Sequence, residues 1–321
     1  MTIEEFLEEW NNSSEQVLVH TSGSTGEPKP MLVEKRRMEA SARTTCDFLG
    51  LHEGDTALLC MSLDYIAGKM MVVRSLVRGL RLITVPPGGH PLAGLSSPID
   101  FAAMVPLQVY NSLQVPAERA RLMAIRHLII GGGFIDESLA AELRSFPHAV
   151  WSTYGMTETL SHIALRRLSG PDADEWYTPF AGVDLTLTEE GCLVIDAPAV
   201  HEGQLVTNDI VQLAPDGRFK ILGRKDNVIC SGGIKIQAEE VERMLRPFLR
   251  VPYIITKRRD QKYGEVVVML TEGDTTTTQS VCERVLPKYW QPRVYIHTDH
   301  IPLTATGKPA RRQAEQMVLY S

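Results

Sequence analysis

Short apolar runs alternate with longer amphipathic stretches over the first half of the chain. Apolar residues at helical spacing predict helices over residues 3–10, 34–49 and 66–79. Brief apolar runs predict strands over residues 17–20, 56–60, 82–85, 101–105 and 127–130. Strands that alternate with helices are typical of βαβ units, so this half of the chain predicts an α/β fold with a mostly parallel sheet.

The pattern changes after Pro179, where turn residues separate short apolar stretches. It predicts strands over residues 183–187, 192–195, 204–207 and 219–222. Gly191 and Gly217 each follow acidic residues, as expected for tight turns between strands. The α/β domain is therefore expected to carry a small antiparallel β region.

A further change falls near residue 225. Beyond it, the pattern predicts a helix over residues 238–245, strands over 253–256 and 265–270, and a polar loop over 275–278. We therefore expect two domains. Residues 1–225 form the larger domain and residues 226–321 form a small α+β domain.

Composition and charge exclude several classes of protein. The chain has 321 residues, of which 44% are hydrophobic and 22% charged, as in ordinary globular proteins. The net charge of -6 predicts no general affinity for nucleic acid or anionic membranes. No apolar run reaches the roughly 18 residues of a membrane span, and the acidic N-terminus is unlike a signal peptide. Five irregularly spaced cysteines without a CxxC pair predict neither disulfides nor a zinc site, so a cytoplasmic location is expected.

A segment rich in glycine and hydroxyl residues follows the strand predicted at residues 17–20. Its glycines let backbone N–H groups approach an anion closely, and its four hydroxyls can donate to phosphate oxygens. The segment is not a Walker A loop, because the lysine does not follow the second glycine directly. A flexible linker is the alternative, but the preceding strand and the Pro-Lys ending favour a phosphate loop. Its predicted phosphate-binding residues are Thr21, Ser22, Gly23, Ser24, Thr25, Gly26 and Lys29.

Residues 21–29 resemble the phosphate loop of the adenylate-forming enzymes, which include acyl-CoA synthetases, luciferases and adenylation domains. Further segments match motifs of this superfamily in its order, at residues 154–159, 207–209, 223–227 and 302–308. The resemblance implies an ATP-dependent acid–CoA ligase. Such an enzyme uses ATP and Mg²⁺ to convert a carboxylic acid into an acyl-adenylate, and then transfers the acyl group to the thiol of CoA.

The resemblance also assigns roles in the first step. Tyr154 would face the adenine, Thr157 would lie near the α-phosphate, and Glu158 would hold Mg²⁺. Lys308 would reach the substrate carboxylate and the α-phosphate from a C-terminal loop, where a cation stabilises growing negative charge. The glycines Gly131, Gly132 and Gly133 would lie along the adenine, and the residues Asp209 and Arg224 would bind the ribose. Without the resemblance, a simple turn and a helix N-cap would explain the glycines and the Thr-Glu pair.

For the second step, the resemblance implies a mobile C-terminal domain that pivots at Asp226. Gly232, Gly233 and Lys235 would then enter the active site and form the thiol tunnel. These residues favour CoA without excluding the thiol of a carrier protein. Asn208 stands where the superfamily has glycine, and asparagine also tolerates left-handed backbone angles.

Two segments resemble the o-succinylbenzoate–CoA ligases of menaquinone biosynthesis, namely residues 154–164 and 65–68. Those relatives have His at the position of Tyr65 and an Arg nine residues later, where this chain has Arg74. A dicarboxylate needs a cation for its non-reacting carboxylate, and Arg74 is the candidate, with Lys69 and His162 as rivals. Ser161 and Tyr65 complete the predicted acid pocket. A salt bridge within its own helix is the alternative role for Arg74.

The chain departs from most members of the superfamily in length. They carry a large segment before the phosphate loop, so we expect part of the usual N-terminal domain to be missing or rebuilt, and a homodimer is a hypothesis for covering the exposed core. Three other functions stay open. They are a ligase for another aromatic or short carboxylic acid, an enzyme that loads a carrier protein, and a nucleotide-binding protein without turnover.

Overall fold

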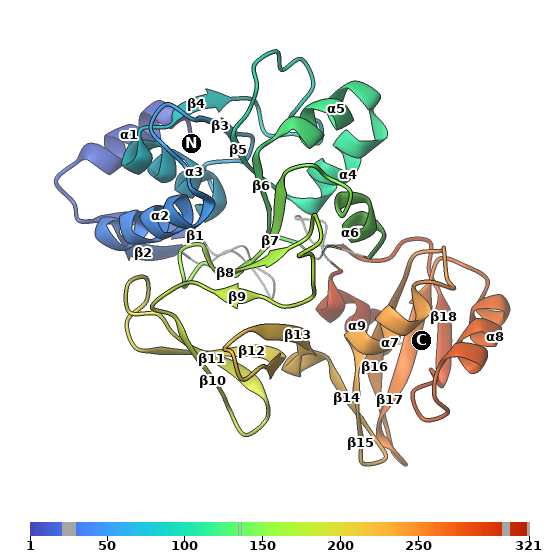
Figure 1. Ribbon diagram of the computed structural model, residues 1–321. Coiled ribbons are helices and arrows are strands. Elements are labelled where there is room, and N and C mark those ends of the chain that lie inside the picture. The colour runs from blue at the N-terminus through green and yellow to red at the C-terminus, as the bar shows by residue number, and fades with distance from the viewer. Residues whose placement is uncertain (21–29, 134, 136, 304–308, 320–321) are drawn as a thin grey trace. The chain divides into compact units, whose positions relative to one another are not determined.

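The computed structural model describes residues 1–20, 30–133, 135, 137–303 and 309–319 (Figure 1). The chain forms two compact units. The N-terminal unit comprises Met1–Leu185, Ile195–Leu205 and Ala214–Phe219, and the C-terminal unit comprises Thr186–Val194, Val206–Leu213 and Lys220–Ser321. The C-terminal unit thus contains all of residues 226–321 together with earlier segments, and the proposed boundary at residue 225 stays a prediction.

A seven-stranded sheet forms the centre of the N-terminal unit, in the order β4-β3-β5-β6-β7-β8-β9. Neighbouring strands from β4 to β7 run parallel, and β8 and β9 add antiparallel pairs at one edge. The mostly parallel sheet predicted from the alternating pattern is confirmed. Its strands are β3 (Thr56–Leu59), β4 (Arg81–Thr84), β5 (Phe101–Met104), β6 (His127–Ile130), β7 (Ala149–Gly155), β8 (His162–Arg167) and β9 (Thr178–Pro179).

Helices cover both faces of this sheet (Figure 1). Ala57 and Leu59 of β3 pack on one face with α1, α2 and α3, whereas Leu58 and Cys60 pack on the other face with α4, α5 and α6. Burial on both faces explains why the strands are continuous apolar runs instead of alternating patterns. The helices are α1 (Ile3–Asn11), α2 (Lys35–Leu49), α3 (Ile66–Arg78), α4 (Pro106–Gln114), α5 (Pro116–Ala124) and α6 (Glu137–Leu143).

A β-hairpin precedes the large sheet in the chain. β1 (Gln16–His20) pairs with β2 (Pro30–Glu34) in antiparallel register, from Gln16 opposite Glu34 to His20 opposite Pro30. β1 agrees with the predicted strand, and β2 has no predicted counterpart. Residues 21–29, which join the two strands, lie outside the described residues.

Four further strands pair in chain order, β10-β11-β12-β13. They are β10 (Asp184–Leu187), β11 (Cys192–Asp196), β12 (Gln204–Leu213) and β13 (Phe219–Arg224). Gly191 and Gly217 both have φ of 81°, which fits their predicted turns. The antiparallel β region is confirmed, although β12 extends well beyond its predicted end.

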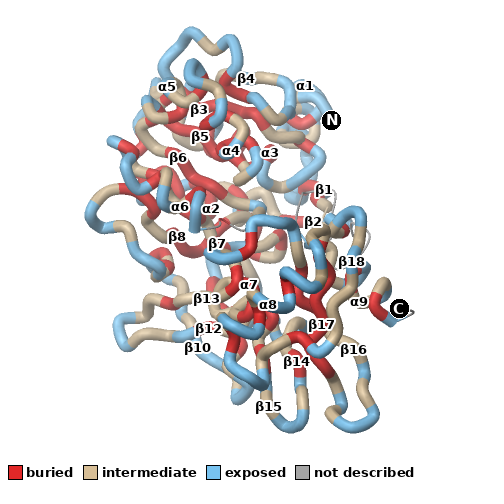
Figure 2. Tube along the Cα trace, turned by 90° about the vertical axis from the view of Figure 1, so that its right-hand side faces the viewer, coloured by how far each residue is buried: buried red, intermediate tan, exposed pale blue. Residues whose placement is uncertain are grey.

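The C-terminal unit contains a five-stranded sheet in the order β15-β14-β17-β16, with β18 paired in parallel to β17. Buried residues follow the central strands of the sheets (Figure 2). One face packs against α7 and α8, and the other face packs against α9. The elements are η1 (Lys225–Asn227), β14 (Val228–Ser231), β15 (Ile234–Gln237), α7 (Ala238–Leu245), β16 (Tyr253–Asp260), β17 (Gly264–Thr271), α8 (Thr275–Val285), β18 (Val294–His297) and α9 (Arg311–Leu319).

The predicted polar loop at residues 275–278 is wrong, because these threonines form the first turn of α8. Asp274 caps the helix by accepting a 2.7 Å hydrogen bond from the backbone N–H of Thr277. Thr278 and Cys282, four residues apart, are both buried on one side of the helix. The N-cap and this buried face outweigh the weak helix propensity of threonine.

Across the described residues, no helix combines the length and the apolar character that a membrane crossing requires.

Candidate active site

Two predicted elements of the active site, the phosphate loop at residues 21–29 and Lys308, lie outside the described residues. The residues on either side of each segment are paired. His20 lies opposite Pro30 in the hairpin, and Leu303 forms an isolated β-bridge with Pro309. Because the phosphate loop and Lys308 lie outside the described residues, the roles of both stay predictions.

Tyr154 lies near the end of β7, and the glycines Gly131–Gly133 directly follow the end of the neighbouring parallel strand β6. β6 ends at Ile130, which lies opposite Ser152 of β7. A Cβ at position 131 would lie 2.3 Å from the hydroxyl oxygen of Thr153, so any residue other than glycine would require this side chain to move. The buried Tyr154 ring packs against Tyr177 and Phe219, with centroid distances of 5.9 and 5.0 Å. The structure thus brings together two predicted adenine-binding elements.

A tight turn after β7 carries Thr157 and Glu158. Leu160 has a left-handed φ of 64°, and its N–H donates a 2.9 Å hydrogen bond to the carbonyl of Thr157. A Cβ on Gly155 would lie 2.1 Å from the carbonyl oxygen of Ser161, so the strand requires glycine at this turn. Thr157 is buried and Glu158 is half-buried. The described chain contains no group of three or more potential metal ligands, but Mg²⁺ bound to substrate phosphates requires only one or two carboxylates.

Within the C-terminal unit, the predicted ribose-binding residues are close together. Arg224 Nη1 lies 3.3 Å from Asp209 Oδ1, and Arg224 Nη2 lies 3.5 Å from Asp226 Oδ2. Asn208 donates a 3.2 Å hydrogen bond to the same Asp226 oxygen. Asn208 lies inside β12 and has no left-handed φ, so the tolerance of asparagine for left-handed angles plays no part here. The asparagine that replaces the glycine of the superfamily instead bonds to Asp226, the predicted hinge residue.

The predicted thioester-step residues form the hairpin between β14 and β15. Gly232 and Gly233 have φ of 58° and 86°, the left-handed angles that a two-residue hairpin turn needs. Lys235 is exposed on β15 opposite Cys230. The glycine pair is therefore explained locally by the turn, and its role toward a thiol stays a prediction.

Arg74 is a buried cation on α3, with 2% of its surface exposed. Its Nη2 donates a 2.6 Å hydrogen bond to the Ser161 hydroxyl, whereas Nε has no hydrogen-bond partner in the described chain. No carboxylate of the described residues lies within ion-pair distance of Arg74. Burial lowers the pKa of Arg74 to about 10, so the side chain stays charged at neutral pH. A buried charge without a counter-ion is unfavourable, so this position is suited to an anionic ligand.

His162 lies beside the same hydroxyl. Its Nδ1 is 3.1 Å from Ser161 Oγ, and its Nε2 is 3.2 Å from Thr45 Oγ1 on α2. Burial, with a smaller effect from Arg74, holds the pKa of His162 well below its usual value. The imidazole is thus uncharged at neutral pH, which leaves Arg74 as the cation of this group. Thr45 is not among the residues predicted from the sequence, since a threonine inside a helix gives no signal of such a contact.

Lys69, the other rival cation, is already paired. Its Nζ donates a 2.6 Å hydrogen bond to the Leu18 carbonyl and lies 3.6 Å from a Glu9 carboxylate oxygen on α1. Tyr65 is exposed at the start of α3. Three residues later, a Cβ on Gly68 would lie 2.2 Å from the Ser62 carbonyl oxygen. This glycine therefore allows α3 to approach the preceding loop closely.

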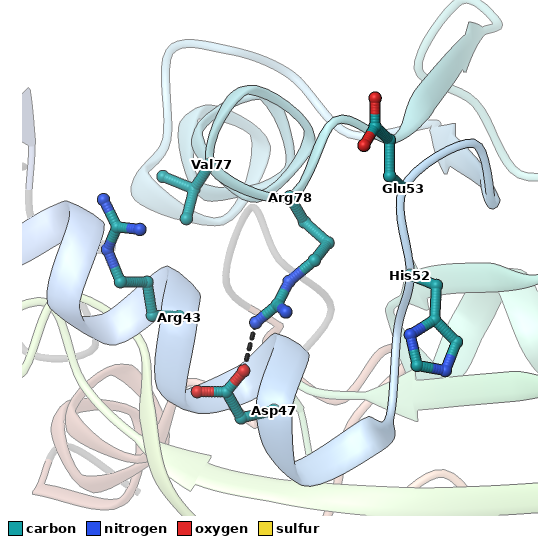
Figure 3. A pocket seen from close by; sticks show the side chains of 6 residues that line it. All are labelled: Arg43, Asp47, His52, Glu53, Val77 and Arg78. Carbon is teal, nitrogen blue, oxygen red and sulfur yellow. Dashed lines mark hydrogen bonds and ion pairs between the residues drawn. The ribbon is translucent and has the colours of Figure 1, made fainter.

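A surface depression at the C-terminal ends of α2 and α3 is not part of this site (Figure 3). Arg78 and Asp47 are bonded to each other across it. Small-molecule sites are mostly apolar, whereas Val77 is the one apolar residue among those that line the depression. The lining residues are Arg43, Asp47, His52, Glu53, Val77 and Arg78.

Comparison with known proteins identifies the class that this fold and site define. A model of the AMP-binding enzyme family matches residues 6–207. The chain belongs to the AMP-binding enzyme family, the adenylate-forming superfamily, and its class within it is that of the acid–CoA ligases. The superfamily expected from the motif series is confirmed, and so is the fold class.

Particular relatives give a finer comparison. A 2-succinylbenzoate–CoA ligase of Bacillus cereus is 25% identical over 97% of this chain and 72% of its own length. A crystal structure of an acyl-CoA synthetase (AMP-forming)/AMP-acid ligase II-like protein from Dyadobacter fermentans is 32% identical, with a TM-score of 0.67, and the match covers 98% of this chain and 93% of that chain. The O-succinylbenzoate CoA synthetase of Bacillus subtilis, solved with ATP and magnesium, has a TM-score of 0.75 at 23% identity. That match covers 92% of this chain and 69% of the other, and it supports the fold alone.

Proposed function

We propose that the chain joins a dicarboxylic acid, o-succinylbenzoate, to CoA. The observation that carries this proposal is Arg74, a buried guanidinium without a carboxylate partner in the described chain. An acid with a second carboxylate would supply the missing counter-ion. The Bacillus cereus relative named for 2-succinylbenzoate supports the same choice of acid.

In the first step, an oxygen of the reacting carboxylate attacks the α-phosphorus of ATP. The bond from that phosphorus to the bridging oxygen breaks, and pyrophosphate leaves. The N–H groups and hydroxyls of residues 21–26 would hold the phosphates, with Lys29 adding positive charge. Asp209 and Arg224 would hold the ribose. Positioning and charge neutralisation then provide most of the catalysis, as in other phosphoryl transfers.

Thr157 and Lys308 would contact the negative charge that grows on the α-phosphate and the attacking carboxylate. Mg²⁺, held by Glu158 and phosphate oxygens, would supply further neutralisation when bound. The position of Glu158 in the tight turn that follows β7 supports this assignment, since the hydrogen bond from Leu160 to Thr157 fixes the backbone of the turn.

In the second step, the sulfur of CoA attacks the acyl carbon, the thiol proton is released, and AMP leaves. We propose that residues 226–321 pivot at Asp226 between the two steps and bring Gly232, Gly233 and Lys235 toward the thiol. The local support is that Asp226 lies in a short 3-10 turn and is held by side-chain contacts from Arg224 and Asn208. Such contacts can break and re-form at small cost on an exposed surface.

The test is pyrophosphate release from ATP with o-succinylbenzoate and with benzoate, which lacks the second carboxylate. We expect release with o-succinylbenzoate. Release with benzoate alone would replace this proposal by a ligase for a monocarboxylic acid, and no release with any acid would favour a nucleotide-binding protein without turnover.

Arg74→Met tests the pocket itself. Loss of a charged hydrogen bond of about 2–3 kcal/mol corresponds to a rise of roughly 30- to 150-fold in the KM for o-succinylbenzoate. The KM for ATP should stay unchanged. Arg78→Met, one helical turn away and paired with Asp47 at the surface, is the matched control. Equal effects of Arg74→Met on both substrates would remove Arg74 from the acid pocket.

A further inference from the structure

A chain of hydrogen bonds runs from Arg74 into the core of the N-terminal unit. Arg74 Nη2 contacts Ser161 Oγ at 2.6 Å, and Ser161 Oγ contacts His162 Nδ1 at 3.1 Å. His162 Nε2 contacts Thr45 Oγ1 at 3.2 Å, and Thr45 donates a 3.1 Å hydrogen bond to the Ser41 carbonyl. Thr45 comes from α2 and Arg74 from α3, whereas Ser161 and His162 lie at the junction of the preceding turn with β8, so the chain connects three elements.

The two ends of this chain set its direction. The single hydroxyl hydrogen of Thr45 is donated to the Ser41 carbonyl, so Thr45 Oγ1 accepts from His162. His162 Nε2 therefore carries the proton, and the neutral ring leaves Nδ1 as an acceptor. At the other end, a guanidinium can only donate, so Ser161 Oγ accepts from Arg74. The hydroxyl hydrogen of Ser161 is then donated to His162 Nδ1.

The reverse arrangement satisfies fewer groups. With the proton on Nδ1, both Arg74 and His162 would donate to Ser161 Oγ. The Ser161 hydrogen would then have no acceptor among these two partners, and the Ser41 carbonyl would lose the Thr45 hydrogen bond. Partly buried polar groups are normally satisfied, so the geometry favours the direction with Nε2 protonated.

We infer that Thr45 and His162 are positioning residues of the acid pocket. Because His162 accepts the hydroxyl hydrogen of Ser161, Ser161 Oγ can only accept a hydrogen bond from Arg74, and this bond orients the guanidinium. The acid carboxylate is then bound by the remaining N–H groups of Arg74 and receives no hydrogen bond from Ser161. Arg74 Nε has no partner in the described chain, and Nη1 has only the weak acceptor Met71 Sδ at 3.8 Å. The part that concerns the acid rests on the proposed function.

The tautomer of His162 tests the inference without any turnover. In the full chain with ¹⁵N-labelled histidine rings, ¹⁵N chemical shifts distinguish a protonated from an unprotonated ring nitrogen, and His162→Gln assigns the signal. We expect Nε2 to be protonated in the free protein and to stay so when o-succinylbenzoate is added. A protonated Nδ1 in the free protein, or a switch to it with the acid, would overturn the inference.

Kinetics of Thr45 variants test the positioning role. Thr45→Val keeps the shape and removes the hydroxyl, and it should raise the KM for o-succinylbenzoate about tenfold, within the range of one lost hydrogen bond. The KM for ATP should change less than about twofold. Thr45→Ser, which keeps the hydroxyl, should have the wild-type KM for o-succinylbenzoate. Thr44→Val is the matched control, since Thr44 makes the same type of bond, 3.0 Å to the Ala40 carbonyl.

The two proposals fail in distinguishable ways. If the wild-type protein does not use o-succinylbenzoate, the proposed function fails, and the His162 tautomer of the free protein still decides the direction of the chain. If the wild type uses this acid but Thr45→Val behaves like Thr44→Val, or raises both KM values together, the positioning role is wrong. If Thr45→Val does not fold, Thr45→Ser and the tautomer measurement decide.

Discussion

Arg311→Met removes an ion pair that connects α9 to α7 in the C-terminal unit. Arg311 Nη1 and Nη2 donate to the two carboxylate oxygens of Glu242 at 2.9 and 2.7 Å. Nη1 also donates a 3.0 Å hydrogen bond to the Ile255 carbonyl on β16. Arg311 lies at the first position of α9, three residues after Lys308 in the sequence.

The expected loss of stability follows from the exposure of the pair. Removing one partner of a fully buried ion pair costs about 3–5 kcal/mol, because the other charge is left without compensation. The side chains of Arg311 and Glu242 keep 21% and 12% of their exposure, so water can partly solvate the remaining carboxylate. Glu242 also keeps its 2.9 Å hydrogen bond from the Ile255 N–H. We therefore expect a loss of about 2–3 kcal/mol in the free energy of unfolding.

Urea unfolding gives the free energy, and hydrogen exchange at the Ile255 amide gives a local measurement, because that N–H donates to Glu242. Arg312→Met, which changes the adjacent exposed arginine, is the matched control. A loss below about 0.5 kcal/mol for Arg311→Met, comparable with a surface substitution, would refute the reasoning.

Three further predictions concern the active site and its surroundings. Lys308→Ala should abolish pyrophosphate release yet leave thioester formation from supplied acyl-adenylate largely intact; an equal loss of both half-reactions would contradict the two-step assignment. His162 has a lowered pKa when folded, so the unfolded chain takes up a proton as the pH falls below 6.5, and folding stability should drop there by up to about 1.4 kcal/mol per pH unit. His162→Gln should remove this part of the pH dependence in urea unfolding, and an unchanged slope between about pH 6.5 and 5 would disprove it. Gly155→Ala should destabilise the protein by more than about 2 kcal/mol, because its Cβ would meet the Ser161 carbonyl oxygen, whereas Gly88→Ala, with space around it, should change stability little in the same measurement.

Much of the fold could be predicted from the sequence, because long amphipathic helices and fully buried strands have clear patterns. α2 and α3 agree with their predicted ranges to within a residue, and β3 and β6 lie where short apolar runs occur. The antiparallel region was signalled by turn glycines. The α8 helix was not predicted, since four consecutive threonines have weak helix propensity, and the burial of Thr278 depends on the tertiary packing.

Less of the candidate site than of the fold could be predicted from the sequence. Lys69 and Arg74 are both buried cations on α3, and nothing in their local sequence distinguishes their roles. The distinction comes from Glu9, far away in the chain, which lies beside Lys69 and has no equivalent beside Arg74 among the described residues. The resemblance proposed Arg74 for the acid pocket, and that role stays a prediction. The contact of His162 with Thr45 could not be predicted, because it depends on how α2 packs against β8.

The burial of the central strands on both faces raises the question of what holds β3 in place along its neighbours. A slip by one residue would exchange Ala57 and Leu59 with Leu58 and Cys60, and all four are apolar, so the hydrophobic pattern alone barely opposes the slip. Asp100, just before β5, opposes it. Its carboxylate accepts hydrogen bonds of 2.8 and 2.7 Å from the N–H and hydroxyl of Thr56, and its own N–H donates to the Thr56 carbonyl at 3.0 Å. The polar Asp100 just before β5 therefore fixes the register between β3 and β5, which the apolar side chains of β3 alone do not determine.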